Sequence, residues 1–307
     1  MIDRILNRFS PQRKQLQSEV ENLKEELRGI KNLVGRIAAD ICVHDDLRSS
    51  EFKVYSQFGE DGILQFLVKN LPISNKIFIE FGVEHYSEAN TRFLLINDNW
   101  KGLIIDGSKE HMDFVRNQDI SWRYDLTAVA KFITKENINS IFTENGFEGK
   151  IGILSIDIDG NDYWVWENIN TVDADIVVAE YNSVYGSKLA VSVPYQADFY
   201  RTDHHTSNLY WGCSLKALNF LAEKKGYALV GCNNNGNNCF FVKKSLLNGK
   251  VKAVSVEDAY VESKFRESRD EQGNLTFITG SQRLQIIKDL TVVEVELNQK
   301  KKISELL

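Results

Sequence analysis

Apolar residues recur every three or four positions near the start of the chain. The series begins after Ser10-Pro11, which is a favourable helix start, and consists of Leu16, Val20, Leu23, Leu27, Ile30, Val34, Ile37 and Ile41. Alternating steps of four and three are typical of a coiled coil. Glu19 and Glu26 take g positions, and Lys24 and Lys31 take the e positions that follow, which favours a parallel partner. We predict a coiled-coil helix within residues 1–45 that self-associates as a dimer or trimer. An amphipathic helix lying on its own domain is the alternative.

A polar break at residues 44–50 ends this helix, and strand and helix patterns alternate after it. Short apolar runs predict strands at residues 77–81, 102–106, 121–124, 176–179 and in the run beginning at Ile151, with a helix at 128–142 among those between them. Such alternation predicts an α/β fold with a parallel sheet. Two later runs, at 227–230 and 239–242, flank an Asn-rich turn and predict a closing antiparallel hairpin. We therefore expect a domain at 46–250 and a C-terminal extension at 251–307.

The run beginning at Ile151 ends in three carboxylates, Asp157, Asp159 and Asp162, which Gly160 interrupts. A short apolar run between turn residues is typical of a strand buried on both faces. Ligands of open α/β sheets bind beyond the carboxyl ends of such strands. Three acids crowded there need a metal, a cationic substrate group or a transferred proton among them.

Composition excludes several classes of function. The chain has 307 residues and a formal net charge of −6, which argues against general nucleic-acid binding. No apolar run approaches the roughly 18–20 residues of a membrane span, and the polar, basic N-terminus lacks the apolar region of a signal peptide. The four cysteines show no zinc spacing; Cys232 and Cys239 could pair, but reduced thiols fit better. We expect a cytoplasmic protein, with the inner face of the membrane as a further location.

Acidic residues follow three successive predicted strands. Glu80 and Gly82 close the first, and a single tight turn with an acid before it suits a ligand that carries a positive group and no pyrophosphate. Asp106 ends the second strand, where an acid can hold two ribose hydroxyls. Asp125 follows the next predicted strand and is suited to an adenine amino group. We expect these four residues to bind the cofactor.

This order of strands and acids resembles that of class I S-adenosylmethionine-dependent methyltransferases. Ile156-Asp-Ile-Asp-Gly-Asn-Asp162 is similar to the K-I-D-V-E-G-x-E signature of the FkbM-like methyltransferases, and Tyr55-Ser-Gln-Phe-Gly-Glu-Asp61 resembles an S-Q-x-G-E-D motif of some relatives. The resemblance runs from about Tyr55 to Lys243. It implies a Rossmann-like sheet, S-adenosylmethionine as cofactor, and O-methylation of a hydroxyl on a sugar, a glycan or a natural product. Ser155 stands where the signature has Lys, and the first loop is poor in glycine.

Acids at two neighbouring strand ends predict a metal. Asp157 and Asp159 follow one strand, and Glu180 and Asn182 follow the next, so their oxygens can converge on Mg²⁺ or Mn²⁺. Other metal-dependent O-methyltransferases are similar, with acids and an Asn at those strand ends. Such an ion would bind the acceptor hydroxyl and lower its pKa. The alternative is that Asp157 caps the next helix and Asp162 is solvated.

Further candidates lie in a polar segment at residues 184–210 and beside it. His204 or His205 is expected to accept the proton of the acceptor hydroxyl. Arg201 is suited to a carboxylate or phosphate of the acceptor. Tyr181 and Tyr185 are suited to stacking on a sugar ring, although core packing is the alternative for such aromatics.

Two other functions stay open. Asp157-Ile-Asp159 is also a D-x-D motif, which metal-dependent glycosyltransferases use to hold a nucleotide-sugar diphosphate. A methyltransferase-like domain could also serve as a non-catalytic coiled-coil adaptor.

Overall fold

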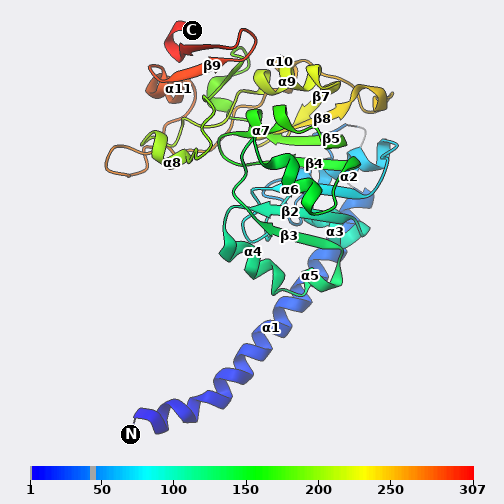
Figure 1. The fold of residues 1–307 in the computed structure, drawn as a ribbon. Coiled ribbons are helices and arrows are strands. Elements are labelled where there is room, and N and C mark those ends of the chain that lie inside the picture. Colours follow the sequence, from blue (N-terminus) through cyan, green and yellow to red (C-terminus); the bar gives the residue numbers. More distant parts are fainter. Residues whose placement is uncertain (1, 42–45) are drawn as a thin grey trace.

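The strand that carries the acidic run, β4 (Gly149–Ile156), lies at the centre of a seven-stranded sheet (Figure 1). The computed structural model describes residues 2–41 and 46–307, and side chains from residue 13 onward within these ranges. The strand order is β3-β2-β1-β4-β5-β8-β7. The first five of these strands are parallel, whereas β8 is antiparallel to both β5 and β7. The other bounds are β1 (Ile77–Phe81), β2 (Lys101–Asp106), β3 (Leu126–Ala130), β5 (Val172–Glu180), β7 (Tyr227–Cys232) and β8 (Asn238–Lys243).

Helices cover both faces of this sheet, because its central strands are apolar on both sides. Phe78 of β1 packs in one core and its neighbour Ile79 in the other. One face is covered by α2 (Glu60–Asn70), α3 (Arg92–Asp98), α4 (Lys109–Arg116) and α5 (Ile120–Arg123). The opposite face is covered by α6 (Ile138–Glu144), α7 (Asp162–Asn168) and α9 (Leu215–Lys224). The predicted Rossmann-like α/β fold with its closing antiparallel hairpin, β7–β8, is therefore confirmed.

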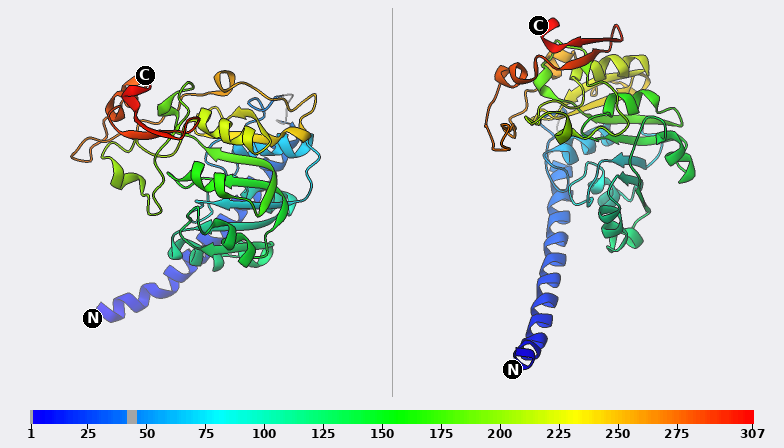
Figure 2. Two further views of the ribbon diagram at one scale, coloured as in Figure 1. Left: turned by 45° about the horizontal axis from the view of Figure 1, so that its top comes forward. Right: turned by 60° about the vertical axis from the view of Figure 1, so that its left-hand side comes forward.

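A second, three-stranded sheet lies beyond the carboxyl end of β5 and has its own apolar core (Figures 1 and 2). Its order is β10-β9-β6, so it joins the segment after β5 to the end of the chain. Its strands are β6 (Val191–Ser192), β9 (Thr291–Glu294) and β10 (Gln299–Lys302). Short helices accompany it or follow the main sheet, namely η1 (Ser183–Tyr185), α8 (Arg201–His204), η2 (Lys244–Leu246), α10 (Val256–Ala259), α11 (Ser281–Ile287) and η3 (Ile303–Glu305).

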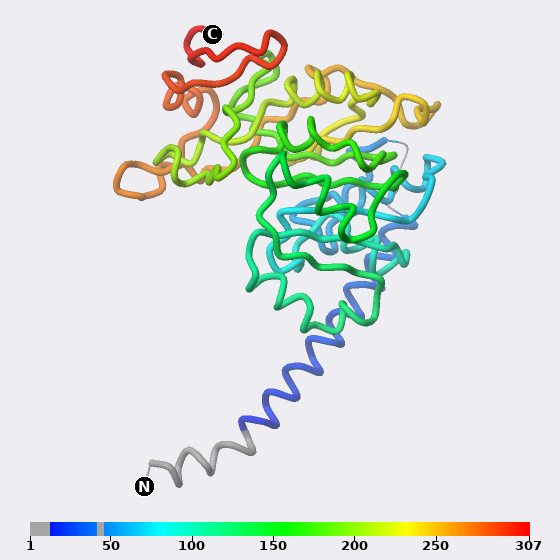
Figure 3. Tube along the Cα trace, viewed as in Figure 1, coloured from blue at the N-terminus to red at the C-terminus, as the bar shows by residue number. Residues whose placement is uncertain are grey.

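The N-terminal helix α1 (Ile2–Ile41) runs along the domain and then extends away from it (Figures 2 and 3). Its later part contacts the domain through Asn32, whose Oδ1 accepts a hydrogen bond of 2.6 Å from the Tyr55 hydroxyl, and through the buried Ala39. A long helix is therefore present where the heptad pattern predicts one. None of the described helices combines the length and the apolar character that a membrane span requires.

One strand and one helix differ from the sequence prediction. Residues 120–123 form α5, and the third strand is Leu126–Ala130, which overlaps the start of the helix predicted at 128–142; helix α6 begins only at Ile138. The cause is composition, because β3 is an edge strand whose side chains are all partly exposed. Its alanines are strong helix formers, so the sequence of this strand resembles that of a helix. The cysteines agree with the prediction, since Cys232 and Cys239 are paired in register across β7 and β8 and remain free thiols.

Candidate functional site

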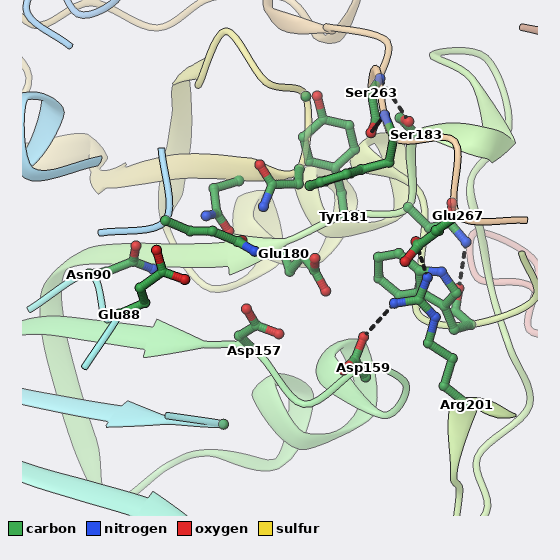
Figure 4. A pocket seen from close by; sticks show the side chains of 18 of the residues that line it. Glu88, Asn90, Asp157, Asp159, Glu180, Tyr181, Ser183, Arg201, Ser263 and Glu267 are labelled. Atoms are coloured by element: carbon green, nitrogen blue, oxygen red, sulfur yellow. Dashed lines mark hydrogen bonds and ion pairs between the residues drawn. The ribbon is translucent and has the colours of Figure 1, made fainter. Parts of the chain in front are cut away.

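A cavity of about 330 Å³ opens at the carboxyl ends of β1, β4 and β5 (Figure 4). This is the edge at which open α/β sheets bind ligands. Seven carboxylates line the cavity, against the two guanidinium groups of Arg201 and Arg283, so it is strongly acidic. The carboxylates belong to Glu80, Glu84, Glu88, Asp157, Asp159, Glu180 and Glu267.

The loops after β1 and β4 are in direct contact at Gly82. This residue has a φ of 79°, and a Cβ added to it would lie 1.5 Å from the carbonyl oxygen of Asp157. Only glycine permits both the left-handed conformation and this close approach of two backbones. Gly82 therefore joins the two loops where they line the cavity, and its predicted role in cofactor binding stays a prediction.

Glu80 is buried and braces the start of α3. Its carboxylate accepts hydrogen bonds of 2.8 Å from the Asn90 amide and 3.0 Å from the Thr91 amide, and one from the Thr91 hydroxyl. Burial raises the pKa of this carboxyl, and the three donors oppose the rise. Glu80 lines the cavity and also positions the loop that leads into α3.

Asp157 and Glu180 form the acidic centre of the cavity. Asp157 follows β4 and Glu180 ends the neighbouring strand β5, and both side chains line the cavity. Burial, followed by the charge of nearby carboxylates, raises the pKa of both well above the usual range. Oε2 of Glu180 is buried without a hydrogen-bond partner among the described residues. Such a pair can share a proton, and its unpartnered oxygen can accept another hydrogen bond.

The other two acids of the run have different roles. Asp162 is buried at the start of α7, and its two oxygens accept hydrogen bonds of 2.8 Å from the Ile158 amide and 2.9 Å from the Gly160 amide. Burial raises its pKa to about 6. Asp159 has a φ of 55° and accepts a 3.0 Å hydrogen bond from Arg201 Nη1. Asp162 therefore closes the loop, and Asp159 points toward Arg201 (Figure 4).

Arg201 is held in place by groups of its own chain. Besides Asp159, it forms an ion pair with Glu267, and its guanidinium lies 4.6 Å from the centre of the Trp211 ring. Its Nε and Nη2 donate to the Asn208 carbonyl. Because two carboxylates already neutralise it, Arg201 is less suited to an anionic acceptor group than the sequence predicts.

Asp106 ends β2 as predicted, next to the loop that follows β1. Its carboxylate accepts a hydrogen bond of 2.8 Å from each of the Glu84 and Ser108 amides. His111 Nδ1 lies 3.4 Å from its Oδ1. Each carboxylate oxygen keeps a lone pair for a further donor, so the ribose role stays a prediction.

Asp125 does not lie with the other predicted cofactor residues. It precedes β3 instead of ending a strand, its carbonyl accepts from the Gly102 amide at the amino end of β2, and its exposed side chain forms a 3.6 Å ion pair with Lys101. Because amino ends and carboxyl ends of parallel strands lie at opposite edges, Asp125 is on the far edge from Gly82. The expectation failed because the third strand was predicted at residues 121–124, five residues before β3 begins at Leu126.

Asn182, Tyr181 and Tyr185 are occupied in holding the structure together. The Asn182 amide group donates to the carbonyls of Leu209 and Trp211, and its Oδ1 accepts from the Val184 amide. The hydroxyl of Tyr181 donates to the Val261 carbonyl, and that of Tyr185 donates to the Trp211 carbonyl. Both tyrosines are buried, so core packing, the alternative given for these aromatics, describes them better than sugar stacking. Tyr181 nevertheless forms part of the cavity wall.

The two predicted proton acceptors are outside the cavity wall. The ring of His204 stacks on Phe199 with 4.2 Å between centroids, and His205 Nδ1 is 2.7 Å from the Ser207 hydroxyl. Neither histidine is among the residues that line the cavity. Of the three predicted catalytic residues, only Asp157 lines it.

The predicted metal ligands do not fit together as one coordination site. Asn182 is committed to backbone groups, and Asp159 is paired with Arg201. Across residues 2–41 and 46–307, no group of three or more His, Cys, Asp or Glu side chains is arranged to hold a metal ion. We therefore derive no chemical step through a metal.

Part of the cavity wall comes from the C-terminal extension, and none of its residues was predicted from the sequence. Ser263, Phe265, Glu267 and Arg283 line the cavity from that segment. Arg283 is 3% exposed and donates a 2.9 Å hydrogen bond to Glu262. These residues follow no strand and form no motif, so no sequence signal marks them.

Comparisons with known proteins concern the fold. No family model matches the sequence, and no curated protein matches it either. Among solved structures, the N-terminal domain of EvdMO1 with SAH bound is similar with 12% identity and a TM-score of 0.40, over 68% of this chain and 93% of that one. The same domain has also been solved in the presence of SAH and D-fucose, with 10% identity, a TM-score of 0.37, and 68% and 93% coverage. An S-adenosylmethionine-dependent methyltransferase from Clostridium acetobutylicum has 11% identity and a TM-score of 0.40, over 60% of this chain and 90% of that one.

Proposed function

We propose that the protein is an S-adenosylmethionine-dependent O-methyltransferase of the FkbM-like kind that acts on a hydroxyl of a sugar or glycan, in the cytoplasm. The observation that carries the proposal is the acidic cavity at the carboxyl ends of β1, β4 and β5. The sheet order and the antiparallel β8 support it, because the sequence resemblance implies this arrangement.

The charge of the cavity fits the proposed cofactor. S-adenosylmethionine carries a sulfonium and an ammonium group against one carboxylate, so its net charge is positive. A wall with seven carboxylates and two guanidinium groups attracts such a ligand. Gly82 brings the loop after β1 against the loop after β4, and Asp106 stands beside the first of these loops.

The residues around Asp157 suit transfer to an oxygen atom. When bound, the cofactor supplies a methyl group on a positively charged sulfur. A hydroxyl must lose its proton as it takes up that methyl, and the carboxyl pair of Asp157 and Glu180 offers an acceptor at the centre of the cavity. Burial raises the pKa of this pair, and a base of raised pKa is a stronger proton acceptor. Phe265 and the C-terminal extension close the acceptor side.

The rival glycosyltransferase function fits the cavity less well. A nucleotide-sugar diphosphate is an anion, and the acidic wall repels it. Moreover, the second acid of the D-x-D motif, Asp159, is neutralised by Arg201.

Calorimetric titration with S-adenosylmethionine tests the cofactor site. We expect Asp106→Ala to weaken binding about 10- to 100-fold, because charge-assisted hydrogen bonds contribute about 1.5–3 kcal/mol. Asp125→Ala is the matched control, since it removes an acid from the opposite edge of the sheet, and its affinity should equal that of the unmodified protein. Equal affinities in all three proteins would refute the assignment of Asp106, and no binding to any of them would refute the proposed function.

A further inference from the structure

Helix α1 uses one face to bind its own domain. Numbered by the heptad, Asn32 and Ala39 occupy f positions and Gly35 a b position. Asn32 accepts from Tyr55, Ala39 is 4% exposed, and a Cβ at Gly35 would come within 2.7 Å of Val54 and 2.8 Å of Phe93. The glycine therefore lets the helix lie directly on the domain, and these contacts fix the rotation of the helix about its own axis.

The opposite face carries the heptad seam, which we define as the a and d residues from Leu16 to Ile41. Their exposed fractions run from 41% at Val20 to 67% at Ile41. The alternative in which this apolar face lies on the chain's own domain is therefore excluded for the described side chains. Eight large apolar residues in one line are far more than a solvated helix face carries by chance. They are Leu16, Val20, Leu23, Leu27, Ile30, Val34, Ile37 and Ile41.

We propose that this seam pairs in parallel with the same seam of a second copy of the chain. The proposal does not depend on the enzymatic function. Alternating steps of three and four let a and d side chains interlock with an identical helix. Because the domain contacts hold the seam on the side of the helix away from the domain, the seam of a second chain can reach it.

The charges beside the seam select the orientation. In a parallel pair, Glu19 at a g position faces Lys24 at an e position of the other copy, so opposite charges meet. The next e residue, Lys31, lies instead over the Tyr55 ring of its own domain. In an antiparallel pair, g residues face g residues and e residues face e residues, so glutamates would face glutamates and lysines would face lysines. The sequence therefore disfavours the antiparallel arrangement.

Contacts of the flanking positions favour two copies over three. Lys31, at an e position, lies 4.6 Å from the centre of the Tyr55 ring, and Asp40, at a g position, forms a 3.4 Å ion pair with Lys69. A trimer buries e and g positions more deeply than a dimer, and here both flanks are already turned toward the domain. We therefore expect a parallel dimer.

The full-length chain tests the assembly, because removing the whole helix would uncover Val54 and Phe93. Light scattering should give the unmodified protein twice the chain mass of 35.1 kDa. Leu23→Glu with Ile30→Glu should give the mass of one chain, because four added carboxylates would face each other across the seam. Ser18→Glu with Asn22→Glu adds the same charge at exposed f and c positions off the seam and should leave the dimer intact. A single-chain mass for the unmodified protein, or a dimer of the seam variant, would overturn the proposal.

Disulfide formation tests the orientation without adding charge. Leu16 lies at one end of the described seam, so Leu16→Cys places two thiols together only in a parallel pair; an antiparallel pair brings residue 16 near residue 41. Mild oxidation should link most of this variant into a covalent dimer, and the unmodified protein gives the background from its own cysteines. Cross-linking no greater than that background would contradict the parallel arrangement.

Discussion

At the scale of single residues, the carboxyl pair of Asp157 and Glu180 is the feature with most chemical consequence. Burial and the charge of nearby carboxylates raise the pKa of both, so this pair takes up a proton more readily than solvated carboxylates do. Asp162 and Glu80, close by, are instead satisfied by backbone donors. The same residue types therefore serve two purposes in one cavity, and the hydrogen-bond partners distinguish them.

Substitution of Asp157 tests its proposed role as proton acceptor. We expect Asp157→Asn to lower the turnover rate by a factor of about 10²–10⁴, which is the usual contribution of a general base, while S-adenosylmethionine affinity changes little. Asp159→Asn, two residues away, should lower the rate much less, because Asp159 is neutralised by Arg201. A turnover assay with a hydroxylated sugar acceptor, repeated in EDTA and after addition of Mg²⁺, measures both. We expect EDTA to leave the rate unchanged, and its loss with recovery in Mg²⁺ would restore the metal centre.

The motif residue Asp61 has a structural role that can be measured by pH. Its Oδ2 accepts from the amides of Val54, Tyr55 and Ser56, at 2.7–2.8 Å, and from the Ser56 hydroxyl, whereas its buried Oδ1 has no partner among the described residues. Burial raises its pKa to about 6 from the ordinary 3.8. The folded state therefore holds this proton more tightly than the unfolded state. The stability that it contributes is complete below about pH 4 and is lost as the pH rises through 6.

We expect the stability of the unmodified protein, relative to that of Asp61→Asn, to fall by up to about 3 kcal/mol between pH 4 and pH 7, since one pKa unit corresponds to about 1.4 kcal/mol. Urea unfolding at each pH measures this difference, and the effect of Asp162 cancels because both proteins contain it. Asp203→Asn, at an exposed position, is the control and should show a constant difference. An equally constant difference for Asp61→Asn would show that its pKa is ordinary.

At the scale of elements, the C-terminal extension closes the cavity by contacts with the segment that follows β5. The hydroxyl of Tyr181 donates to the Val261 carbonyl at 2.7 Å, the Ser263 amide donates to the Ser183 hydroxyl at 3.0 Å, and Glu267 pairs with Arg201. The first two contacts are partly buried and the ion pair is more exposed. The extension is therefore anchored near residues 261–263 by partly buried hydrogen bonds, and further along by the ion pair of Glu267 and by the Arg269 amide, which donates to the Ser207 carbonyl.

Limited proteolysis tests this anchoring. Trypsin cleaves after Lys264 and Arg266, which lie just before Glu267 in the chain. We expect Glu267→Ala to increase cleavage there two- to fivefold, because an ion pair of this exposure contributes up to about 1 kcal/mol. Glu271→Ala removes an exposed carboxylate from the same segment and should cleave at the unmodified rate. Equal rates for both variants would mean that the ion pair does not hold the segment.

The elements also show which parts of the structure the sequence can predict. Strands β1, β2, β4 and β5 are apolar on both faces and end at turns or acids, so their positions and the site at their carboxyl ends were predictable. Strand β3 was not, because an edge strand of small residues has no distinct apolar pattern. Because this strand was predicted too early, Asp125 was also expected at the carboxyl end of a strand, whereas it lies at the amino end of β3. The side-chain hydrogen bonds of Asn182 are made to backbone groups far away in the chain, so no local sequence pattern predicts them.

At the scale of the whole molecule, the α/β domain and the helix are joined by contacts that are independent of the seam. Asn32, Gly35 and Ala39 face the domain, while Leu27, Val34 and Ile41 face outward. The heptad pattern identified the outward face from the sequence, since its spacing is local. The domain-facing side was not predictable, because small and polar residues give no periodic signal and their partners lie beyond residue 50.

The fixed rotation of α1 on its domain has a geometric consequence for a parallel pair. Its two-fold axis would run along the helices, so both cavities would lie at the same height along that axis and on opposite sides of it. A surface or a partner that held the tip would keep both cavities at one equal distance from itself. The length of exposed helix between the tip and the domain would then fix the distance between that surface and the two cavities.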